Sequence, residues 1–306
     1  HHDDTILEVV HDPEMVSYMR DAHQVWVSQG YLNDPGQPQV SAYAFPTERF
    51  LDGLPLRAPT SPAALAGVYA MDTMTQIGVG TFQGARAAVD MALTAAELVL
   101  EGGDSAYAAC RPPGHHAGRN FFGGACYLNN AAIAAESLRT GGFSSVTIID
   151  LDAHHGNGTQ QIFYERDDVA YGSVHVDPAA GWFPHFIGHG DESGRGIGEG
   201  ANLNLPLQPE TPDDQWLEGV DRLVGFAKER EASAIVVSLG VDAAISDPNS
   251  PLRITESGYR SAGERIASLD LPTVFIQEGG YVPTTIGGLV SATLNGFDME
   301  RGELQE

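Results

Sequence analysis

Hydrophobic and polar positions follow a helical period over much of the first third of the chain. Residues 1–30 are predicted to be rich in helix, because an apolar stripe recurs on one helical face: Met15, Met19, Ala22 and Trp26. Residues 82–101 form an alanine-rich amphipathic pattern that predicts another helix. Residues 31–68 are rich in proline, glycine and aromatic side chains. A loop of this length in a compact domain usually has a functional or interaction role.

After residue 100 the pattern alternates between short apolar runs and longer amphipathic ones. The short runs predict strands at 105–110, 146–151, 170–176, 234–240 and 273–277. The amphipathic runs predict helices at 127–140, 158–165, 212–231 and 256–268. This alternation predicts an α/β fold in which helices flank a central, mostly parallel sheet.

The domain organisation follows from what the sequence lacks. No linker rich in proline, serine or charge divides the chain, so we predict one domain over residues 1–306. The acidic stretch from Asp298 to Glu306 is predicted to be a solvated end.

Polar side chains follow four of the predicted strands. The four groups are Arg111 to His116, Asp152 to Asn157, Asp242, and Glu278 to Tyr281. In parallel sheets, working residues lie just beyond the carboxyl ends of the strands. We therefore expect the four groups to form a single site on one edge of the sheet.

Carboxylates and an imidazole at these strand ends predict a metal site. Asp150, Asp152 and His154 alternate along the chain, so their side chains point to one side. Asp152 and His154, together with Asp242 from another strand, supply two oxygens and one nitrogen. Such a set leaves a coordination position open, which is typical of a catalytic zinc. Asp242 alone would more simply be a helix cap.

The tandem His115 and His116 follow a rigid turn of two prolines and a glycine. Next to a metal-bound water, two imidazoles offer a general base and a second proton-holding group. Asp150 and Asn157 are predicted to hydrogen-bond their outer nitrogens, and the carboxylate would raise the basicity of one ring. The alternative is a pair of structural histidines in a loop.

Tyr281 follows the pair Gly279 and Gly280 after a predicted strand. A phenol in this position can donate a hydrogen bond to the oxyanion that forms when water attacks a carbonyl. The alternative is a buried tyrosine that bonds to the backbone.

Taken together, four segments resemble the zinc-dependent histone deacetylase superfamily, and within it the acetylpolyamine amidohydrolases. They are Arg111 to Ala117, Asp150 to Gln160, Ser238 to Asp242, and Glu278 to Tyr281. The resemblance covers about residues 5–296. It implies the three-layer arginase-deacetylase α/β fold, with zinc held by Asp152, His154 and Asp242. It also implies that His115 and His116 act as base and acid while Tyr281 polarises the scissile carbonyl.

The same resemblance implies a structural potassium ion, a substrate tunnel and a homodimer. Potassium would be bound by Asp150, Asp152, His154, Ser173 and Val174. The tunnel would have Gly124 at its floor and Phe183 or Trp182 as one wall. Ala125 stands where family members usually carry an aromatic wall, so we expect a wider tunnel. The dimer would form through the loop at 31–68.

Two further features differ from the family pattern. The family's N-terminal strand and rim loop have no counterpart, so we expect them to be missing. Acetylpolyamine specialists carry an acidic residue just before the segment that starts at Gly67, whereas residues 60–64 here contain no acid.

The leading functional prediction is amide hydrolysis by zinc-bound water, with acetylated polyamines or other small cationic acylated amines as substrates. A protein acetyl-lysine deacetylase is the first alternative. An arginase-like ureohydrolase would need a second metal, but His155 stands where its aspartate would be, and no aspartate lies two residues after Asp242. A non-catalytic protein that binds acylated amines is disfavoured because all the proposed catalytic and metal groups are present.

The charge composition of the chain indicates which classes of binding partner to expect. The chain has 16 basic and 41 acidic residues, a net charge of −25, and Lys228 as its only lysine. Such a surface repels phosphate backbones, which argues against nucleic acid, and attracts cations. Adaptation to a salty habitat would explain the same charge. Without an apolar run of about 18 residues or a signal peptide, we expect a cytoplasmic protein that binds no membrane. Cys110 and Cys126 are predicted to be buried thiols.

Overall fold

The computed structural model describes residues 2–33, 36–248 and 250–305. Within these ranges, six strands form one all-parallel sheet in the order β1-β6-β5-β2-β3-β4. The strands are β1 (Ser105–Ala108), β2 (Val146–Asp150), β3 (Val169–Val176), β4 (Asn202–Leu207), β5 (Ala234–Leu239) and β6 (Thr273–Gln277). The prediction of a mostly parallel α/β sheet is confirmed.

Helices cover both faces of this sheet and form three layers with it. One hydrophobic core joins the sheet to the helices α1 (Thr5–Val10), α2 (Pro13–Ser28), α5 (Thr81–Leu100) and α6 (Asn130–Thr140). The other core joins the opposite face to α8 (Asp213–Glu229), α9 (Glu256–Ala267) and α10 (Pro283–Gln305). Because the central strands are buried on both faces, their sequences are nearly continuous apolar runs.

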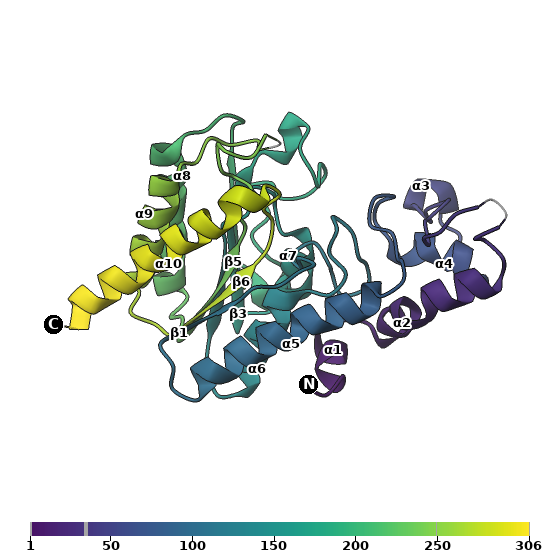
Figure 1. Cartoon of the computed structure of the whole chain (residues 1–306), viewed down its shortest axis with the longest axis horizontal. Coiled ribbons are helices and arrows are strands. Elements are labelled where there is room, and N and C mark those ends of the chain that lie inside the picture. The colour runs from purple at the N-terminus through teal and green to yellow at the C-terminus, as the bar shows by residue number, and fades with distance from the viewer. Residues whose placement is uncertain (1, 34–35, 249, 306) are drawn as a thin grey trace.

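The N-terminal helices behave as their apolar stripe predicts. All four stripe residues are buried: Met15, Met19, Ala22 and Trp26. Figure 1 shows α2 and the following short helices together at one end of the molecule, away from the sheet.

The structure corrects three parts of the sequence analysis. The stretch at 31–68 is not all loop, because α3 (Glu48–Leu51) and most of α4 (Pro62–Tyr69) lie in it, and residues 34 and 35 lie outside the described part. Strand β4 was missed. The end of the chain is not simply solvated, because α10 continues to Gln305 and Arg301 is buried, donating to the carbonyl of Leu271 at 2.7 Å. Residue 306 lies outside the described part.

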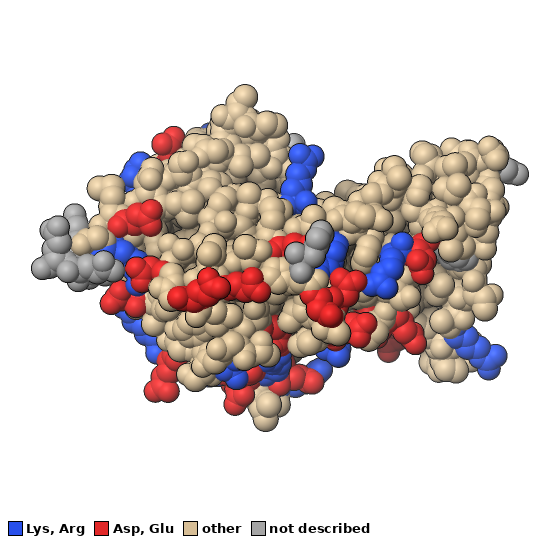
Figure 2. All heavy atoms as spheres, turned by 60° about the horizontal axis from the view of Figure 1, so that its bottom comes forward, with Lys and Arg blue, Asp and Glu red and all other residues tan. Residues whose placement is uncertain are grey.

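Acidic side chains dominate the charged surface. Figure 2 shows them gathered over the lower part of one face, with basic side chains interleaved among them. Several are paired in exposed or half-exposed ion pairs, such as Arg195 with Glu165 and Arg20 with Asp4. Within the described ranges, no helix combines the length and the apolar character needed to cross a bilayer.

Candidate active site

The four polar groups predicted from the sequence lie at the carboxyl ends of neighbouring strands. Arg111 to His116 follow β1, Glu278 to Tyr281 follow β6, Asp242 follows β5, and Asp152 to Asn157 follow β2. These strands are consecutive in the sheet order β1-β6-β5-β2. The structure therefore brings the four groups to one edge, with α7 (Asn157–Phe163) beginning beside them.

Asp152, His154 and Asp242 converge on one point. Their ligand atoms all lie within 4.8 Å of one another. His154 Nδ1 lies 3.0 Å from Asp242 Oδ2 and 3.3 Å from Asp152 Oδ1. Tetrahedral ligands about 2.1 Å from a zinc ion are separated by about 3.4 Å, so these spacings and this donor set fit zinc. Both carboxylates are buried, and no described arginine or lysine pairs with them.

Two glycines make room for these carboxylates. A Cβ built on Gly279 would lie 2.6 Å from both Asp152 Oδ2 and Asp242 Oδ2, and one on Gly240 would overlap Asp152. The N–H of Gly279 instead donates to Asp152 Oδ2 at 2.8 Å. Any side chain at either position would therefore displace a proposed ligand.

The imidazoles of His115 and His116 lie side by side with their centroids 4.0 Å apart. His115 Nδ1 donates to Asp150 Oδ2 at 3.1 Å, and His116 Nδ1 donates to Asn157 Oδ1 at 2.8 Å. The structure thus brings together the pairs expected from the sequence. Since an amide oxygen only accepts, His116 carries its proton on Nδ1 and its Nε2 is free to accept another.

Their different partners give the two rings opposite charge preferences. Burial alone would lower the pKa of His115, but the carboxylates of Asp152 and Asp150 outweigh it and raise this pKa to about 10. Burial and the neighbouring charge of His115 hold the pKa of His116 well below its usual value. The carboxylates therefore favour the protonated form of His115, whereas the surroundings of His116 favour a neutral base.

The predicted tunnel residues surround His116 in part. The ring of Phe183 meets His116 edge-on at 4.7 Å, and Trp182 lies 6.5 Å from His154, centroid to centroid. Gly124 packs against the rings of His116 and Phe183. A Cβ at this position would lie 2.9 Å from the Phe183 ring and would overlap His116. Ala125 is exposed, so no aromatic wall stands at this position.

Asp72 and Thr75 hold the turn that carries this floor, and sequence reasoning missed them. Gly124 and Ala125 both have positive φ, 57° and 63°. Asp72 Oδ2 accepts from the N–H of Gly124 at 2.6 Å, and Thr75 Oγ1 accepts from the N–H of Ala125 at 2.9 Å. These two side chains thus supply hydrogen-bond acceptors for N–H groups of a turn that lies outside the strands of the sheet. No local pattern marks this role, since the partners are 50 residues or more apart.

An apolar groove of about 720 Å³ lies beside the tunnel residues. Phe183, Phe186 and Phe121 line it together with Met71 and Met74, and Asp72 contributes a carboxylate. Asn157 and Phe183 line this groove and also contact His116, so the groove adjoins the His116 ring.

Tyr281 differs from the other predicted site residues because its side chain is 56% exposed. Its backbone N–H donates to Asp247 Oδ2 at 3.2 Å. Partial desolvation and the carboxylates of Asp242 and Asp152 raise the pKa of its phenol, so the hydroxyl stays a donor.

Of the residues predicted to bind potassium, Asp150 lies on β2, Ser173 and Val174 lie on β3, and Asp152 and His154 follow β2. Asp150 and Ser173 are paired in register, and Val174 follows. All three are buried, and Ser173 Oγ lies 2.8 Å from His175 Nδ1.

His155 takes no part in the metal cluster. Its Nε2 lies 2.9 Å from Gln160 Oε1, and its ring packs against His175 with centroids 4.8 Å apart. A Cβ at Gly188 would lie 2.6 Å from the His155 ring. The residue therefore supports the segment that carries Trp182 and Phe183, and is not placed as a ligand.

Comparison with known proteins gives consistent matches over most of the chain. A profile of the histone deacetylase domain matches residues 1–297. The chain is 42% identical over 293 residues to acetylpolyamine amidohydrolase 1 of Pseudomonas aeruginosa, covering 94% of this chain and 81% of that protein. It is 39% identical to the acetylpolyamine amidohydrolase of Mycoplana ramosa, covering 96% and 83%. A crystal structure of acetylpolyamine aminohydrolase from Burkholderia pseudomallei superposes with a TM-score of 0.91 at 35% identity, covering 97% and 84%.

Proposed function

The chain belongs to the histone deacetylase family, and from this premise we propose that it is a zinc-dependent amidohydrolase that deacetylates small cationic amines. The observation that carries the proposal is the convergence of Asp152, His154 and Asp242 beside the adjacent imidazoles of His115 and His116. Among known relatives, several with 36–42% identity are named acetylpolyamine amidohydrolases. We therefore name acetylated polyamines as the first substrate class.

Asp152, His154 and Asp242 would hold the zinc ion. When bound, zinc supplies Lewis-acid polarisation and a lower pKa of water. The two carboxylates and one imidazole leave a position for the substrate, as in other catalytic zinc sites.

His116 is proposed as the general base. Its neutral ring offers Nε2, while Asn157 fixes the tautomer through Nδ1. Water loses a proton to His116 Nε2 as its oxygen bonds to the acyl carbon. When the carbon–nitrogen bond breaks, that proton moves to the amine nitrogen, so acetic acid and a free amine form, and the acid then loses its remaining proton to give acetate. His115, charged and held by Asp150, stabilises the negative charge that develops on the reacting oxygens.

Tyr281 is proposed to donate its hydroxyl to the carbonyl oxygen during this attack. Its exposed side chain lies beyond the carboxyl end of β6, directly after Gly279 and Gly280. Gly280 has a φ of 144°, a conformation that favours glycine.

A substrate panel tests the proposed class. Acetylputrescine, acetylcadaverine and acetylspermidine should be hydrolysed with higher kcat/KM than an acetyl-lysine peptide. Higher kcat/KM on the peptide would favour the protein deacetylase. Negligible release of acetate from every member would contradict deacetylation and direct attention to other acyl groups, for which the exposed Ala125 leaves room.

We also infer a structural potassium ion at Asp150, Asp152, His154, Ser173 and Val174. The inference is supported by the buried register pair of Asp150 and Ser173 on β2 and β3. Replacing potassium by the larger tetramethylammonium ion at equal ionic strength should lower the melting temperature. An identical melting temperature in both salts would argue against this ion.

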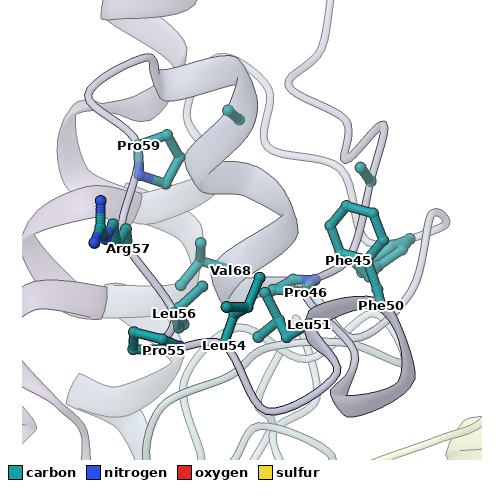
Figure 3. Close-up of a pocket in the computed structure, with 12 residues that line it drawn as sticks. Phe45, Pro46, Phe50, Leu51, Leu54, Pro55, Leu56, Arg57, Pro59 and Val68 are labelled. Atoms are coloured by element: carbon teal, nitrogen blue, oxygen red, sulfur yellow. The ribbon is translucent and has the colours of Figure 1, made fainter.

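A homodimer through the region 31–68 is the third part of the proposal. A hollow of about 570 Å³ lies in this region. Figure 3 draws its lining side chains, which are almost all apolar. Phe50 and Leu54 are 73% and 70% exposed, which is unusual for large apolar groups gathered in one place. A second copy of the chain would cover them.

Light scattering tests this dimer. The wild-type chain should have twice the monomer mass, and Phe50→Ser combined with Leu54→Ser should shift it to monomer. Ile197→Ser is the matched control, because Ile197 is 74% exposed outside this region. A monomeric wild-type chain would exclude the dimer.

A further inference from the structure

Glu278 is a buried carboxylate directly after β6, at the edge of the sheet where the site lies. No described lysine or arginine lies within ion-pair distance of it. Burial makes this carboxylate costly to ionise and raises the pKa of Glu278 to about 7, although the neighbouring His115 lowers it. The position of Glu278 therefore needs a specific explanation.

The partners of Glu278 are backbone N–H groups of the turn that carries the His pair. Its Oε2 accepts from Gly114 at 2.6 Å and from His115 at 3.1 Å. Its other oxygen lies 3.5 Å from Ser238 Oγ on β5. Two successive N–H groups directed at one oxygen favour the ionised form of the carboxyl group and oppose the effect of burial. Glu278 thereby ties the turn after β1 to the neighbouring strand β6.

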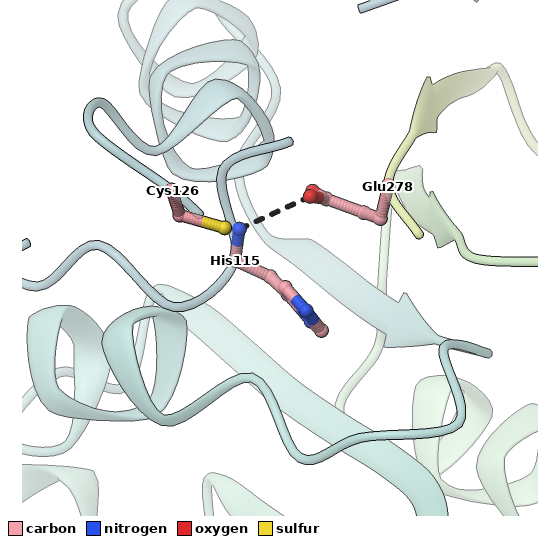
Figure 4. A group of neighbouring side chains, drawn as sticks. All are labelled: His115, Cys126 and Glu278. Atoms are coloured by element: carbon pink, nitrogen blue, oxygen red, sulfur yellow. Dashed lines mark hydrogen bonds between the residues drawn. The ribbon is translucent and has the colours of Figure 1, made fainter. Parts of the chain in front are cut away.

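The same carboxylate could instead belong to a second metal cluster, since ligand atoms of His115, Cys126 and Glu278 lie within 4.8 Å of one another. Figure 4 argues against this, because the dashed line from Glu278 ends on the backbone of His115 and the imidazole points away. His115 Nδ1 is already bonded to Asp150. Burial also raises the pKa of the Cys126 thiol well above its usual value, which disfavours the thiolate that a metal needs.

Both the side chain and the backbone of His115 are thus fixed by hydrogen bonds. Asp150 fixes the ring, while Glu278 fixes the backbone from which the ring extends. The ring nitrogen Nε2 then lies 3.8 Å from Asp152 Oδ1, next to the proposed metal. A shift of the backbone at Gly114 and His115 would change this spacing directly. The turn also packs closely at Gly114, since a Cβ there would lie 2.8 Å from the carbonyl oxygen of Leu128.

We propose that Glu278 is a positioning residue for His115, which sets the place of this imidazole beside the metal by binding the N–H groups of Gly114 and His115. The proposal rests on the proposed function, because it concerns the same site. It assigns Glu278 no contact with substrate. Glu278→Gln keeps an accepting oxygen but removes the negative charge, so it weakens these bonds; the change should act on turnover and leave substrate binding and metal binding nearly intact.

The test compares Glu278→Gln with Glu136→Gln in the full-length, zinc-loaded protein. The expected result for Glu278→Gln is a kcat lower by roughly 10- to 100-fold, the usual effect of misplacing a catalytic group. KM and zinc content should stay within about twofold of wild type. Glu136 is the matched control, a buried glutamate on α6 paired with Arg166. Its variant should keep the wild-type kcat even if its melting temperature falls equally.

Glu278→Asp gives a second, graded measurement. It keeps the charge but is one methylene shorter, so its kcat should lie between those of wild type and Glu278→Gln. Wild-type kcat in Glu278→Gln, or loss of zinc together with kcat, would overturn the proposal. If Glu278→Gln does not fold, Glu278→Asp decides: a kcat lower by about threefold or more at unchanged KM supports the role, and a smaller change overturns it. An inactive wild-type protein would instead refute the proposed function.

Discussion

Tyr281 is the proposed catalytic side chain that the structure holds least tightly. Its neighbours in the site are buried and bonded, whereas Tyr281 is 56% exposed and is fixed through its backbone N–H to Asp247. Its contribution to catalysis should therefore come from one hydroxyl and not from the packing of the site.

Tyr281→Phe removes only this hydroxyl. We expect kcat to fall by roughly 100- to 1,000-fold, the effect of losing one oxyanion donor. Zinc content, measured by elemental analysis, should not change, because Tyr281 is not among the converging ligand atoms. A rate equal to that of wild type would remove Tyr281 from the mechanism.

His11 predicts how stability depends on pH. It is fully buried, its Nδ1 lies 2.8 Å from the carbonyl of Gly118, and its Nε2 accepts from Asn129 N–H at 2.9 Å. Burial lowers the pKa of His11 from 6.5 to about 4. The unfolded chain then binds the proton more tightly, so the stability that His11 contributes is present above pH 6.5 and is lost as the pH falls toward 4. The loss amounts to roughly 3 kcal/mol.

Urea unfolding at pH 7 and pH 4.5 checks this prediction. His11→Gln keeps a donor and an acceptor but cannot titrate, so its free energy of unfolding should fall less between the two pH values than that of wild type. Equal falls in both proteins would mean that His11 is not the group responsible.

At the scale of elements, the sequence predicts five of the strands, including the edge strand β1, and misses the other edge strand, β4. Strands β2, β5 and β6 are buried runs of apolar residues, which any helix-covered parallel sheet requires. Strand β4 alternates Asn202, Leu203, Asn204 and Leu205 before Pro206, and proline is tolerated because the strand lies at the edge. Its place depends on pairing with β3, which no local pattern shows.

The candidate site was predictable where chemistry follows a strand directly, as at Asp152 or Asp242. It was not predictable where a side chain acts on distant backbone. Asp72, Thr75 and Glu278 bind N–H groups of other segments, and their roles appear only when the turns at Gly114 and Gly124 are in place.

The segment that carries Trp182 and Phe183 should depend on one glycine. Gly188 and Gly181 both have positive φ, 107° and 93°. A Cβ at Gly188 would press on the His155 ring, whereas one at Gly181 would meet no atom within 4 Å. The N–H of Gly188 also binds Glu192, and its carbonyl lies 2.9 Å from His175 Nε2.

Gly188→Ala and Gly181→Ala separate backbone strain from crowding. Both should lose about 1 kcal/mol from the unfavourable φ, and Gly188→Ala should lose roughly 1–3 kcal/mol more. Gly188→Ala should also raise KM, because Phe183 shifts against His116. Equal unfolding midpoints for the two variants would contradict the predicted clash between a Cβ at position 188 and the His155 ring.

For the whole molecule, a net charge of −25 predicts attraction of cationic substrates over distance. Salt screens such attraction beyond roughly 10 Å at 0.1 M. KM for acetylputrescine should therefore rise several-fold between 50 and 500 mM NaCl, while KM for the uncharged N-butylacetamide should stay constant. An equal rise of KM for both amides would contradict electrostatic attraction of the substrate and favour a role of the acidic surface in solubility.

The central claim is that one zinc ion at Asp152, His154 and Asp242 supports amide hydrolysis. Acetate release from acetylputrescine, measured while zinc is titrated into chelator-treated protein, tests it most directly. We predict loss of activity on chelation, recovery that saturates at one zinc per chain, and no recovery in Asp242→Asn. Activity that survives complete removal of metal, or that needs two metal ions per chain, would contradict the account.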